Sequence, residues 1–566
     1  MIINNNLTAL SALNATKAAN DMVSKPIKPL ATGLKINSAS DDASGLAISE
    51  KTRSQIKGYD MAFKNAQDGI SMLRVAEGAL ITTNDLLHRM RELSVQAGNG
   101  SLTMQDRTHI QEEIDGLREQ INHISDYTKF NTKTLLNGNA GALWSADDSK
   151  LKVRVKGGLL TLDTNGNKHN SEANYRLEIR AEPGKAQVQK SNIMSVTETV
   201  FVDGDDGSKL EVYYDKALWE IGQFYNSEGS FFVDEPQKLT LIQGNGKTAS
   251  VMIYREDTLH DTASKINAAI SDGLGQSVYA DNAGKFAVIS DGTESTSESV
   301  LSRSELYDDN GNLTGYDIKS TLVIRSAVQG SDGDIYFAGN ENLITALGLN
   351  TIQDSEEATY RVSVYDAHTG EVVVSDMKVT GHELGGIIHP NIDVEFDPMA
   401  GTLAHWDEST KQYLMTSDGT YTANIHLADN GLTLQTGTNQ SETFGVQLGN
   451  VSSEMLGVDR VNVMTRELAD KSLTYIDSAI DSVVKQRSQI VSYSNALEHS
   501  IANITVSSEN LADTRSHITD TDYAQSTMRF IEFQILSKAG EAMLSQANQQ
   551  PEAVFSLLGN SQPQKF

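Results

Sequence analysis

Hydrophobic residues recur every three or four positions along both ends of the chain, among polar neighbours. Near the N-terminus the pattern begins with Leu7, Leu10 and Leu13. It continues further on through Tyr59, Phe63, Ala66, Ile70, Leu73 and Leu80. Near the C-terminus it runs through Leu473, Ile476, Ile480, Val483, Ile490, Leu497, Phe530, Phe533, Leu536, Met543 and Leu544. Such narrow stripes are typical of coiled-coil helices, so we expect each end to pair with the other end or with another copy.

Two features interrupt the pattern at the N-terminal end. Pro26 and Pro29 lack an amide donor, so we expect a helix to kink or end there. Gly33 and the run NSASDDASG at 37–45 indicate a loop followed by a new helix start. The pattern therefore predicts a first helix that is broken near residue 26 and a second that begins close to residue 45.

The middle of the chain alternates hydrophobic and polar residues, which predicts strands. The clearest runs are LKVRV (151–155), YRLEI (175–179), LEVYY (210–214), YRVSVY (360–365) and YTANIHL (421–427). Turn clusters separate these runs, and one amphipathic helix is predicted near Thr258–Ile270. We therefore expect an α+β fold, with a long helical coiled coil or bundle formed by both termini and two or more inserted β-rich outer domains.

Charge is distributed unevenly along the 566 residues, whose net charge is −29. Residues 1–140 carry 15 bases and 15 acids, and residues 466–566 carry 8 bases and 12 acids. The region 141–465 therefore has a net charge of −25, since −29 minus 0 and minus −4 leaves −25. This acidity predicts a separate, well-solvated middle region and argues against nucleic acid as a partner.

The absence of Cys excludes a disulfide scaffold, thiolate catalysis and Cys-ligated metal sites. The N-terminal sequence MIINNNLTALSALNATKAAN is polar and lacks the pattern of a signal peptide. The chain also lacks a stretch of about 18 apolar residues, so we expect no membrane insertion. These features favour a protein that is cytosolic or is exported by a route that needs no such signal.

Three short motifs resemble metal sites but lack the spacing that metal binding needs. The motif HELGG begins at His382 and Glu383, but Gly386 stands where a helical zinc motif needs its second His. The runs DTNGN (163–167) and DDNGN (308–312) lack the later Gly and Glu of a calcium loop. We expect a turn between strands at HELGG, hairpin turns at the other two motifs, and neither a catalytic residue nor a metal or cofactor.

The two ends resemble bacterial flagellin. At the N-terminal end the resemblance rests on INNNLTALSALN (3–14), TGLKINSASDDASGLAIS (32–49), KNAQDGISMLRVAEGAL (64–80) and RMRELSVQAGNG (89–100). At the C-terminal end it rests on SQIVSYSNALEHSIANI (488–504), ENLADTRSHITDTDYAQ (509–525) and LSQANQQPEAVFSLL (544–558). Several motifs in the same order make the resemblance specific, and it covers roughly 240 residues of the chain.

The resemblance implies a non-enzymatic subunit that polymerises into the helical flagellar filament for swimming motility and is exported through the flagellar secretion channel. It implies an inner tube, a helical rod layer and a variable outer layer. The expected segments are 1–45 (inner-tube helix and linker), 46–140 (rod), 141–465 (outer, with a small inserted unit at about 239–289), 466–510 (rod) and 511–566 (inner-tube helix). Pro26 and Pro29 depart from the uninterrupted inner helix of the family.

The resemblance also implies which residues make contacts. For inner-tube assembly we expect Leu7, Leu10, Leu13, Ile535, Leu536, Leu544, Val554, Leu557 and Leu558. For the rod layer and the epitope of a flagellin-sensing Toll-like receptor we expect Arg89, Arg91, Glu92, Leu93, Glu113 and Ile490. The implied partners are further copies of the chain, an export chaperone, and the cap and hook–filament junction proteins.

Three alternatives remain open at this point. The striped residues could form the core of the chain's own bundle, since packing usually stabilises helices. The chain could be a hook–filament junction protein, which shares terminal helices, although the QANQQPEAVFSLL ending at 546–558 favours the filament subunit. The outer domain could also be a glycan-binding adhesin, because adhesion needs only a surface groove.

Overall fold

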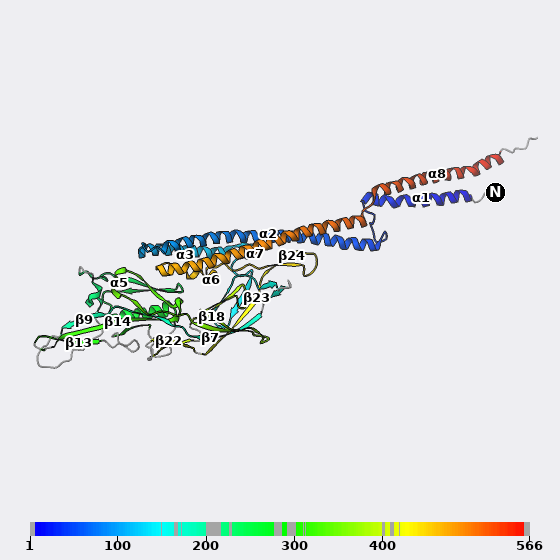
Figure 1. Cartoon of the computed structure of the whole chain (residues 1–566). Coiled ribbons are helices and arrows are strands. Elements are labelled where there is room, and N and C mark those ends of the chain that lie inside the picture. The colour runs from blue at the N-terminus through cyan, green and yellow to red at the C-terminus, as the bar shows by residue number, and fades with distance from the viewer. Residues whose placement is uncertain are drawn as a thin grey trace, which may run out of the picture. The chain divides into compact units, whose positions relative to one another are not determined.

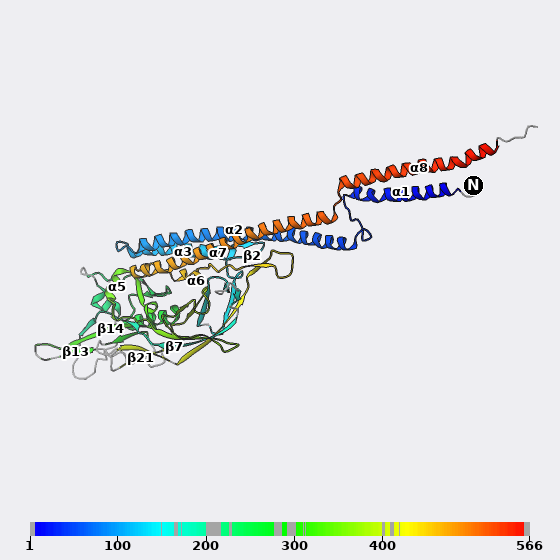
Figure 2. The ribbon, with the colours of Figure 1, turned by 45° about the vertical axis from the view of Figure 1, so that its right-hand side comes forward.

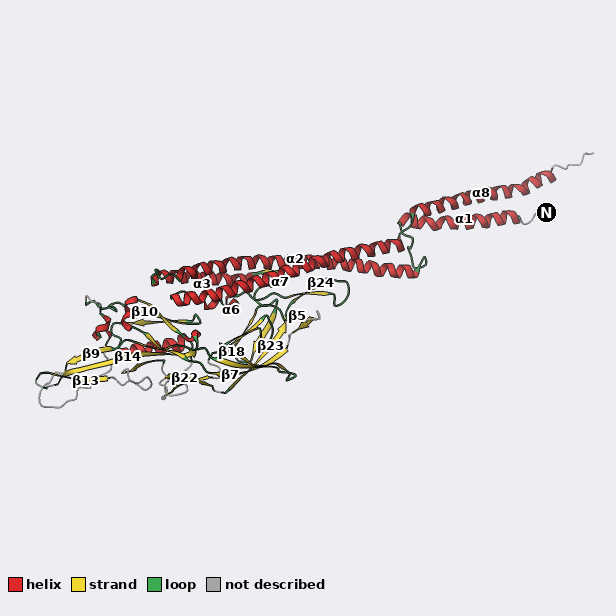
Figure 3. Ribbon diagram, in the orientation of Figure 1, coloured by secondary structure: helices red, strands yellow, loops and turns green. Residues whose placement is uncertain are grey.

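The structure is a computed structural model that describes the chain apart from residues 1–5, 149, 163–167, 171–172, 200–216, 226–228, 277–285, 291–301, 310, 312, 399–401, 408–411, 418 and 560–566. The chain forms two compact units. Unit 1 comprises Met1–Ser71, Thr433–Phe444 and Ser494–Phe566, and unit 2 comprises Met72–Leu432 and Gly445–Tyr493. Figure 3 colours the terminal helices red and the strands of the middle region yellow.

In unit 1, helices α1 (Leu7–Thr32) and α8 (Tyr523–Gly559) lie side by side, as both ribbon views show (Figures 1 and 2). The Asn6 side chain accepts a hydrogen bond from the amide of Ala9 and so caps the start of α1. The same side chain donates to the carbonyl of Ala547 at 2.9 Å, which ties α1 to α8. The two ends of the chain therefore pair with each other within one subunit, which is one of the two partners that the sequence left open.

Small side chains form most of the fully buried part of the seam between α1 and α8. The buried positions of α1 are Thr16, Ala19 and Pro26. Ser537 is the matching buried residue of α8, and its hydroxyl donates to the side chain of Asn20 at 2.6 Å. Half-buried residues extend the seam at helical spacing: Ala9, Ala12, Val23 and Leu30 on α1, and Phe530, Phe533, Gly540, Leu544 and Ala547 on α8. Small residues allow two helix backbones to approach closely.

The expected helix end at Pro26 or Pro29 is wrong, and the kink that was the other expectation stays a prediction. Helix α1 continues through both prolines to Thr32 and stops at Gly33, whose φ of 74° places it in the left-handed region. Each proline removes one backbone hydrogen bond, but Pro26 is buried in the seam and gains apolar contact there. Packing against α8 therefore compensates a local defect that sequence alone reads as a break.

Helices α2 (Ala43–Ala97) and α7 (Arg466–Thr519) are the longest in the chain, and residues of each belong to both units. The start of α2 fits the predicted loop, since the Asp42 carboxylate accepts from the amide of Gly45 at 2.9 Å. In unit 2, α3 (Met104–Tyr127) begins at a capping box between Thr103 and Asp106. The apolar stripes here are buried inside the bundle: Leu73, Ala76, Leu80, Leu87 and Met90 on α2, Ile110, Ile114 and Ile121 on α3, and Ile476, Ala479 and Val483 on α7.

The rest of unit 2 contains two β-rich cores. The first core contains the sheet order β12-β14-β8-β16, with β13 and β9 also paired to β14, and the sheet order β11-β10-β15. The bounds are β8 (Ala186–Lys190), β9 (Met194–Thr199), β10 (Gln237–Gln243), β11 (Thr248–Ile253), β12 (Ala287–Ser290), β13 (Ser302–Tyr307), β14 (Leu313–Gln329), β15 (Ile335–Gly339) and β16 (Asn350–Gln353).

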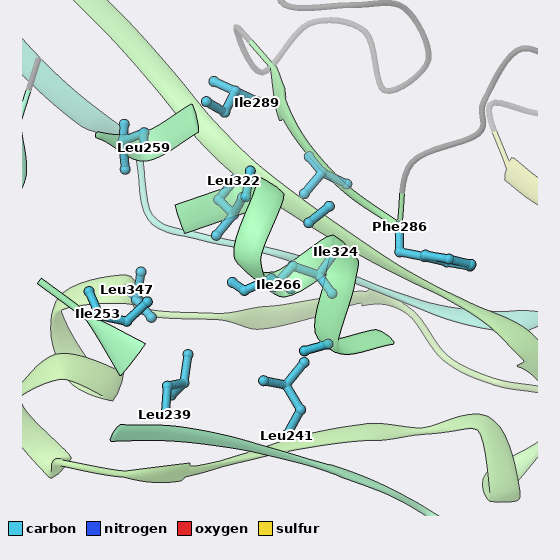
Figure 4. Packing of buried hydrophobic residues seen from close by; sticks show 14 of the residues in the cluster. Leu239, Leu241, Ile253, Leu259, Ile266, Phe286, Ile289, Leu322, Ile324 and Leu347 are labelled. Carbon is cyan, nitrogen blue, oxygen red and sulfur yellow. The ribbon is translucent and has the colours of Figure 1, made fainter. Parts of the chain in front are cut away.

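Helices cover these sheets. They are α4 (Leu259–Ala268), the π-helical turn η3 (Ala269–Gly273), α5 (Glu341–Leu347) and the 3-10 turns η1 (Leu218–Glu220), η2 (Gly222–Phe224) and η4 (Ser331–Gly333). Figure 4 shows Ile266 of α4 between Leu322 of β14 and Leu241 of β10, so this helix fills the space between the two sheets. The predicted helix near Thr258–Ile270 is confirmed, and Thr258 caps it.

The second core pairs a five-stranded sheet, β18-β17-β7-β23-β3, with a three-stranded sheet, β19-β20-β4. Buried Tyr175, Leu177, Ile179 and Ala181 alternate with less buried residues along β7, as expected of a strand with one buried face. The bounds are β3 (Ala142–Ala146), β4 (Leu151–Val155), β7 (Ala173–Glu182), β17 (Thr359–Asp366), β18 (Val372–Thr380), β19 (Glu383–Gly385), β20 (Ile392–Phe396) and β23 (Thr420–Asp429).

The remaining described elements are short. They are β1 (Lys129–Phe130), β2 (Lys133–Thr134), β5 (Leu160–Leu162), β6 (Lys168–Asn170), β21 (Thr402–Asp407), β22 (Gln412–Ser417), β24 (Leu432–Gln435), β25 (Thr443–Val446), α6 (Ser453–Leu456) and the 3-10 turn η5 (Val458–Arg460). Four of the five predicted strand runs are confirmed as β4, β7, β17 and β23, and LEVYY (210–214) lies outside the described residues.

Candidate assembly interface

Large apolar side chains of α1 and α8 point away from the seam into solvent. Leu7, Leu10 and Ile535 are 64%, 53% and 62% exposed. The other large apolar residues exposed on these two helices are Leu13, Met22, Ile27, Tyr523, Met528, Ile531, Leu536 and Met543. Covering one such side chain stabilises an assembly by about 1.5–3 kcal/mol. A helix pair whose most buried residues are small, and whose outer faces carry exposed large apolar residues, is therefore suited to association with further chains.

The predicted inner-tube residues divide into three groups. Leu7, Leu10, Leu13, Ile535 and Leu536 are exposed, whereas Leu544 is half-buried on the face of α8 that carries the seam. Val554, Leu557 and Leu558 lie in α8, but their side chains are outside the described part of the chain. The leucine stripe of α1 therefore does not make the pairing with α8, which corrects the simplest reading of the pattern.

In unit 2, the predicted rod residues with charged side chains form ion pairs at the surface. Arg89 contacts Glu113 of α3 at 2.7 Å and Glu92 at 3.2 Å. Arg91 contacts Asp477 of α7 at 2.7 Å. The hydrogen bond to Glu113, followed by the one to Glu92, raises the pKa of Arg89. Because exposed ion pairs stabilise a fold only weakly, their main effect is to fix where these side chains lie.

Leu93 and Ile490 are buried, so they are not part of a surface that another subunit could contact. Each is 2% exposed, because it packs inside the helical bundle of its own chain. For these two side chains the structure favours the alternative role, a core of the chain's own bundle. Direct contact of Leu93 with a receptor or a neighbouring subunit would require the bundle to open. The role that remains for Leu93 is packing in the core of the bundle.

Two kinds of contributor are absent from the sequence-based expectations. Asp477, the partner of Arg91, lies 386 residues away in sequence, so no local signal marks it. The exposed side chains of Met22, Ile27, Met528 and Ile531 were also missed. A signal did exist for these four, because they fall outside the helical spacing of the seam, which runs through Thr16, Ala19 and Pro26 on α1 and through Phe530, Phe533 and Ser537 on α8.

The short motifs form ordinary strands and turns. HELGG contains strand β19 and does not form the predicted turn, since Glu383 and Leu384 pair with Glu395 and Val394 of β20. DDNGN lies between the paired strands β13 and β14, with Asn310 and Asn312 outside the described residues, and DTNGN (163–167) lies wholly outside them. Within the described residues, no group of three or more His, Cys, Asp or Glu side chains is placed to hold a metal ion. No helix there has both the length and the apolar character to cross a membrane.

Comparison with known proteins gives consistent similarities at both ends. Residues 3–140 match the bacterial flagellin N-terminal helical region, and residues 473–558 match the bacterial flagellin C-terminal helical region. Flagellin from Clostridium tyrobutyricum is 25% identical over 552 residues, covering 98% of this chain and 100% of the relative. Flagellin B from Vibrio cholerae is 27% identical over 560 residues, covering 98% and 99% of the two chains.

Solved structures of flagellar proteins also match, with low TM-scores. Hook associated protein-3 from Legionella pneumophila has a TM-score of 0.25 and 14% identity, covering 83% of this chain and 98% of its own. FliC from Burkholderia pseudomallei has a TM-score of 0.20 and 13% identity, covering 75% and 99%.

Proposed function

The chain belongs to the bacterial flagellins, and from this premise we propose that the solvent-exposed apolar faces of α1 and α8 are the surfaces through which it assembles into the inner wall of the filament. The chain is a structural filament subunit and not an enzyme. Its relatives are flagellins over nearly the whole chain, so neither a hook–filament junction role nor an adhesin is favoured. The filament is an extracellular polymer that joins the hook through junction proteins.

The observation that carries the proposal is the exposure of Leu7, Leu10 and Ile535 beside a seam of small residues. A helical polymer needs two different complementary patches on each subunit, so that each added subunit presents a new site. Two helices with apolar residues on faces outside their mutual seam can supply both patches. Burial of several such side chains then supplies the free energy of association.

We further propose the remaining layer assignments, which rest on the resemblance at the two ends and on the charge of the middle region. We assign 1–45 and 511–566 to the inner tube, 46–140 and 466–510 to the rod layer, and 141–465 to the outer layer. The rod layer would use Arg89, Arg91, Glu92 and Glu113 at its surface, held in place by their ion pairs. The acidic β-rich cores of residues 141–465 suit a surface in contact with water.

Two further proposals concern partners. The export of this chain would use the flagellar secretion channel, with an export chaperone before transport and the cap at the growing tip. A Toll-like receptor that senses flagellin would bind near Arg89 and Glu113 on the monomer. In a receptor reporter assay, the double variant R89A/E113A should respond several-fold less than wild type, and R53A, an exposed Arg elsewhere on α2, should respond normally. Equal responses from all three proteins would refute this epitope.

The assembly proposal is tested by adding purified monomer to short wild-type filament seeds and measuring their growth by electron microscopy. The variant is L10Q/I535Q, and the control is K17Q, which replaces an exposed polar residue of α1. In the proposed filament each of these two side chains is buried against a neighbouring subunit, which stabilises the contact by about 1.5–3 kcal/mol. Replacing both should therefore weaken subunit addition at least about 100-fold. Growth of the double variant at the control rate, with unchanged helix content by circular dichroism, would contradict the proposal.

A further inference from the structure

A group of mostly buried charged side chains lies in unit 2, apart from the assembly surfaces. Arg154 of β4 contacts Glu383 at 2.9 Å and Glu395 at 2.5 Å. Arg460 of η5 contacts the same two carboxylates, Glu383 at 2.9 Å and Glu395 through its second nitrogen. Two arginines thus clamp two neighbouring strands, β19 and β20. The guanidinium groups are nearly fully buried, at 12% and 9% side-chain exposure.

His382 completes this group by joining it to a third segment. Its Nε2 atom lies 3.4 Å from a carboxylate oxygen of Asp332 and 3.7 Å from one of Glu395. The imidazole also faces the edge of the Phe396 ring at 6.5 Å between centroids. Asp332 belongs to η4, the turn that connects β14 to β15 in the first core. We call Arg154, Asp332, His382, Glu383, Glu395 and Arg460 the ionic joint.

The ionic joint lies where three parts of unit 2 meet. Asp332 comes from the first β core, four members come from the second β core or its flank, and Arg460 precedes helix α7. Helix α7 reinforces the meeting point, since Lys471 donates to the carbonyl of Ser331 at 2.8 Å and the Tyr475 hydroxyl reaches Asp332 at 3.5 Å. The joint therefore connects both β cores to the helical part of unit 2.

Over its six side chains, the ionic joint is neutral when His382 carries a proton, and two further charged residues, Asp459 of η5 and Lys471 of α7, adjoin it. Two arginines contribute +2 and the carboxylates of Asp332, Glu383 and Glu395 contribute −3, which leaves −1. A protonated imidazole brings the sum to 0. Buried charge is costly unless it is paired and hydrogen-bonded, and a protonated imidazole between the carboxylates of Asp332 and Glu395 is paired on both sides.

The titration behaviour agrees with this geometry. Burial alone would lower the pKa of His382, but the hydrogen bond to Glu395 and the negative charges of Asp332 and Glu395 outweigh both burial and the repulsion from Arg460, and they raise it. Protonation of His382 therefore stabilises the folded state below the ordinary pKa of histidine. That stabilisation is lost as the pH rises through the raised pKa of the folded state.

We propose that the ionic joint is a pH-dependent lock, which holds the two β cores on the helical part while His382 is protonated and loosens when His382 loses its proton. Arg154, Glu383, Tyr475 and Lys471 surround the imidazole's immediate partners and set the strength of the lock. The lock operates within one subunit, so it is independent of the proposed assembly surfaces. Its consequence for a filament is an outer layer whose attachment responds to alkalinity.

The test uses hydrogen exchange of the full-length monomer between pH 6 and pH 9, expressed as protection factors so that intrinsic exchange is removed. Protection of the amides in β19, β20 and η4 should fall several-fold across this range in wild type. In H382Q it should be lower and independent of pH. The control H368Q removes an exposed histidine from the turn after β17 and should behave as wild type.

A second variant keeps the test decisive if H382Q does not fold. D332N removes one negative neighbour of His382 at nearly constant size, so the fall in protection should move to lower pH. The titration of wild-type ¹³C-labelled histidines by NMR should show the same midpoint as the exchange data. Constant protection in wild type, the same pH dependence in H382Q, or an unmoved midpoint in D332N would each overturn the lock.

Discussion

At the scale of single residues, Gly246 shows how closely the chain packs at the ionic joint. Its φ is +87°, and a Cβ atom there would lie 2.5 Å from the carbonyl oxygen of Arg460. Gly311 has a similar φ of +78° but open space where a Cβ would go. A side chain at Gly311 would cause backbone strain alone, whereas one at Gly246 would cause both strain and steric overlap.

The comparison predicts unequal costs for two alanine substitutions. G311A should destabilise by about 1 kcal/mol, since an L-residue pays about that much in the left-handed region. G246A should cost clearly more, because it adds overlap with the Arg460 backbone and displaces the joint. Thermal unfolding of both variants measures the difference. Equal unfolding temperatures would contradict the close packing at Gly246.

The lowered pKa of Glu395 predicts that unit 2 loses stability at acidic pH. Burial alone would raise its pKa, but the hydrogen bond from His382 and the charges of Arg460 and Arg154 outweigh burial and lower the pKa to about 2. A lowered pKa means stability that is present above the unfolded value of 4.5 and is lost as the pH falls toward about 2.

In unfolding measurements, wild type should therefore lose stability between these pH values. E395Q should be less stable at pH 7, since it leaves two arginines poorly paired, and should lose less on acidification. E454Q, an exposed carboxylate paired with Lys152, should follow wild type. An E395Q profile parallel to that of wild type would remove Glu395 as the cause.

At the scale of elements, the prolines of α1 are a defect that packing tolerates. Pro29 is only half-buried, so its main effect on the folded chain is a missing hydrogen bond. P29A should restore that bond and increase hydrogen-exchange protection of α1, because proline in a helix interior costs about 3 kcal/mol relative to alanine. P26A restores a bond as well but removes buried ring atoms from the seam, so its gain should be smaller. A loss of protection in P29A would show that the proline has a role in packing.

The sequence predicts the type of element well, and the reason is periodicity. The stripes of α2 and α7 and the alternation in β4, β7, β17 and β23 each report a buried face, and the structure has those elements. Periodicity does not say which neighbour buries a face. The spacing of Leu7 and Leu10 predicts a helical stripe without its partner, and in the structure Thr16 and Ala19 occupy the seam instead.

The candidate site was predicted less completely than the fold. The resemblance to flagellin implies Arg89, Glu92 and Glu113, but it gives no indication of Asp477 or of the burial of Leu93. The ionic joint shows the same limit, because Arg154, Asp332 and Arg460 come from three distant segments. Contacts between segments far apart in sequence depend on topology, which hydrophobic patterns do not encode.

At the scale of the whole molecule, the account makes one central claim: the chain is a filament subunit whose α1 and α8 are covered by neighbouring copies. The most direct test is the structure of filaments grown from the purified full-length chain on seeds, determined by electron cryo-microscopy. The account predicts a hollow tube in which Leu7, Leu10, Leu13, Ile535 and Leu536, all exposed in the single chain, are buried between subunits, with the β-rich cores outermost. A tube in which these side chains still face solvent, or a chain that never extends a seed, would contradict it.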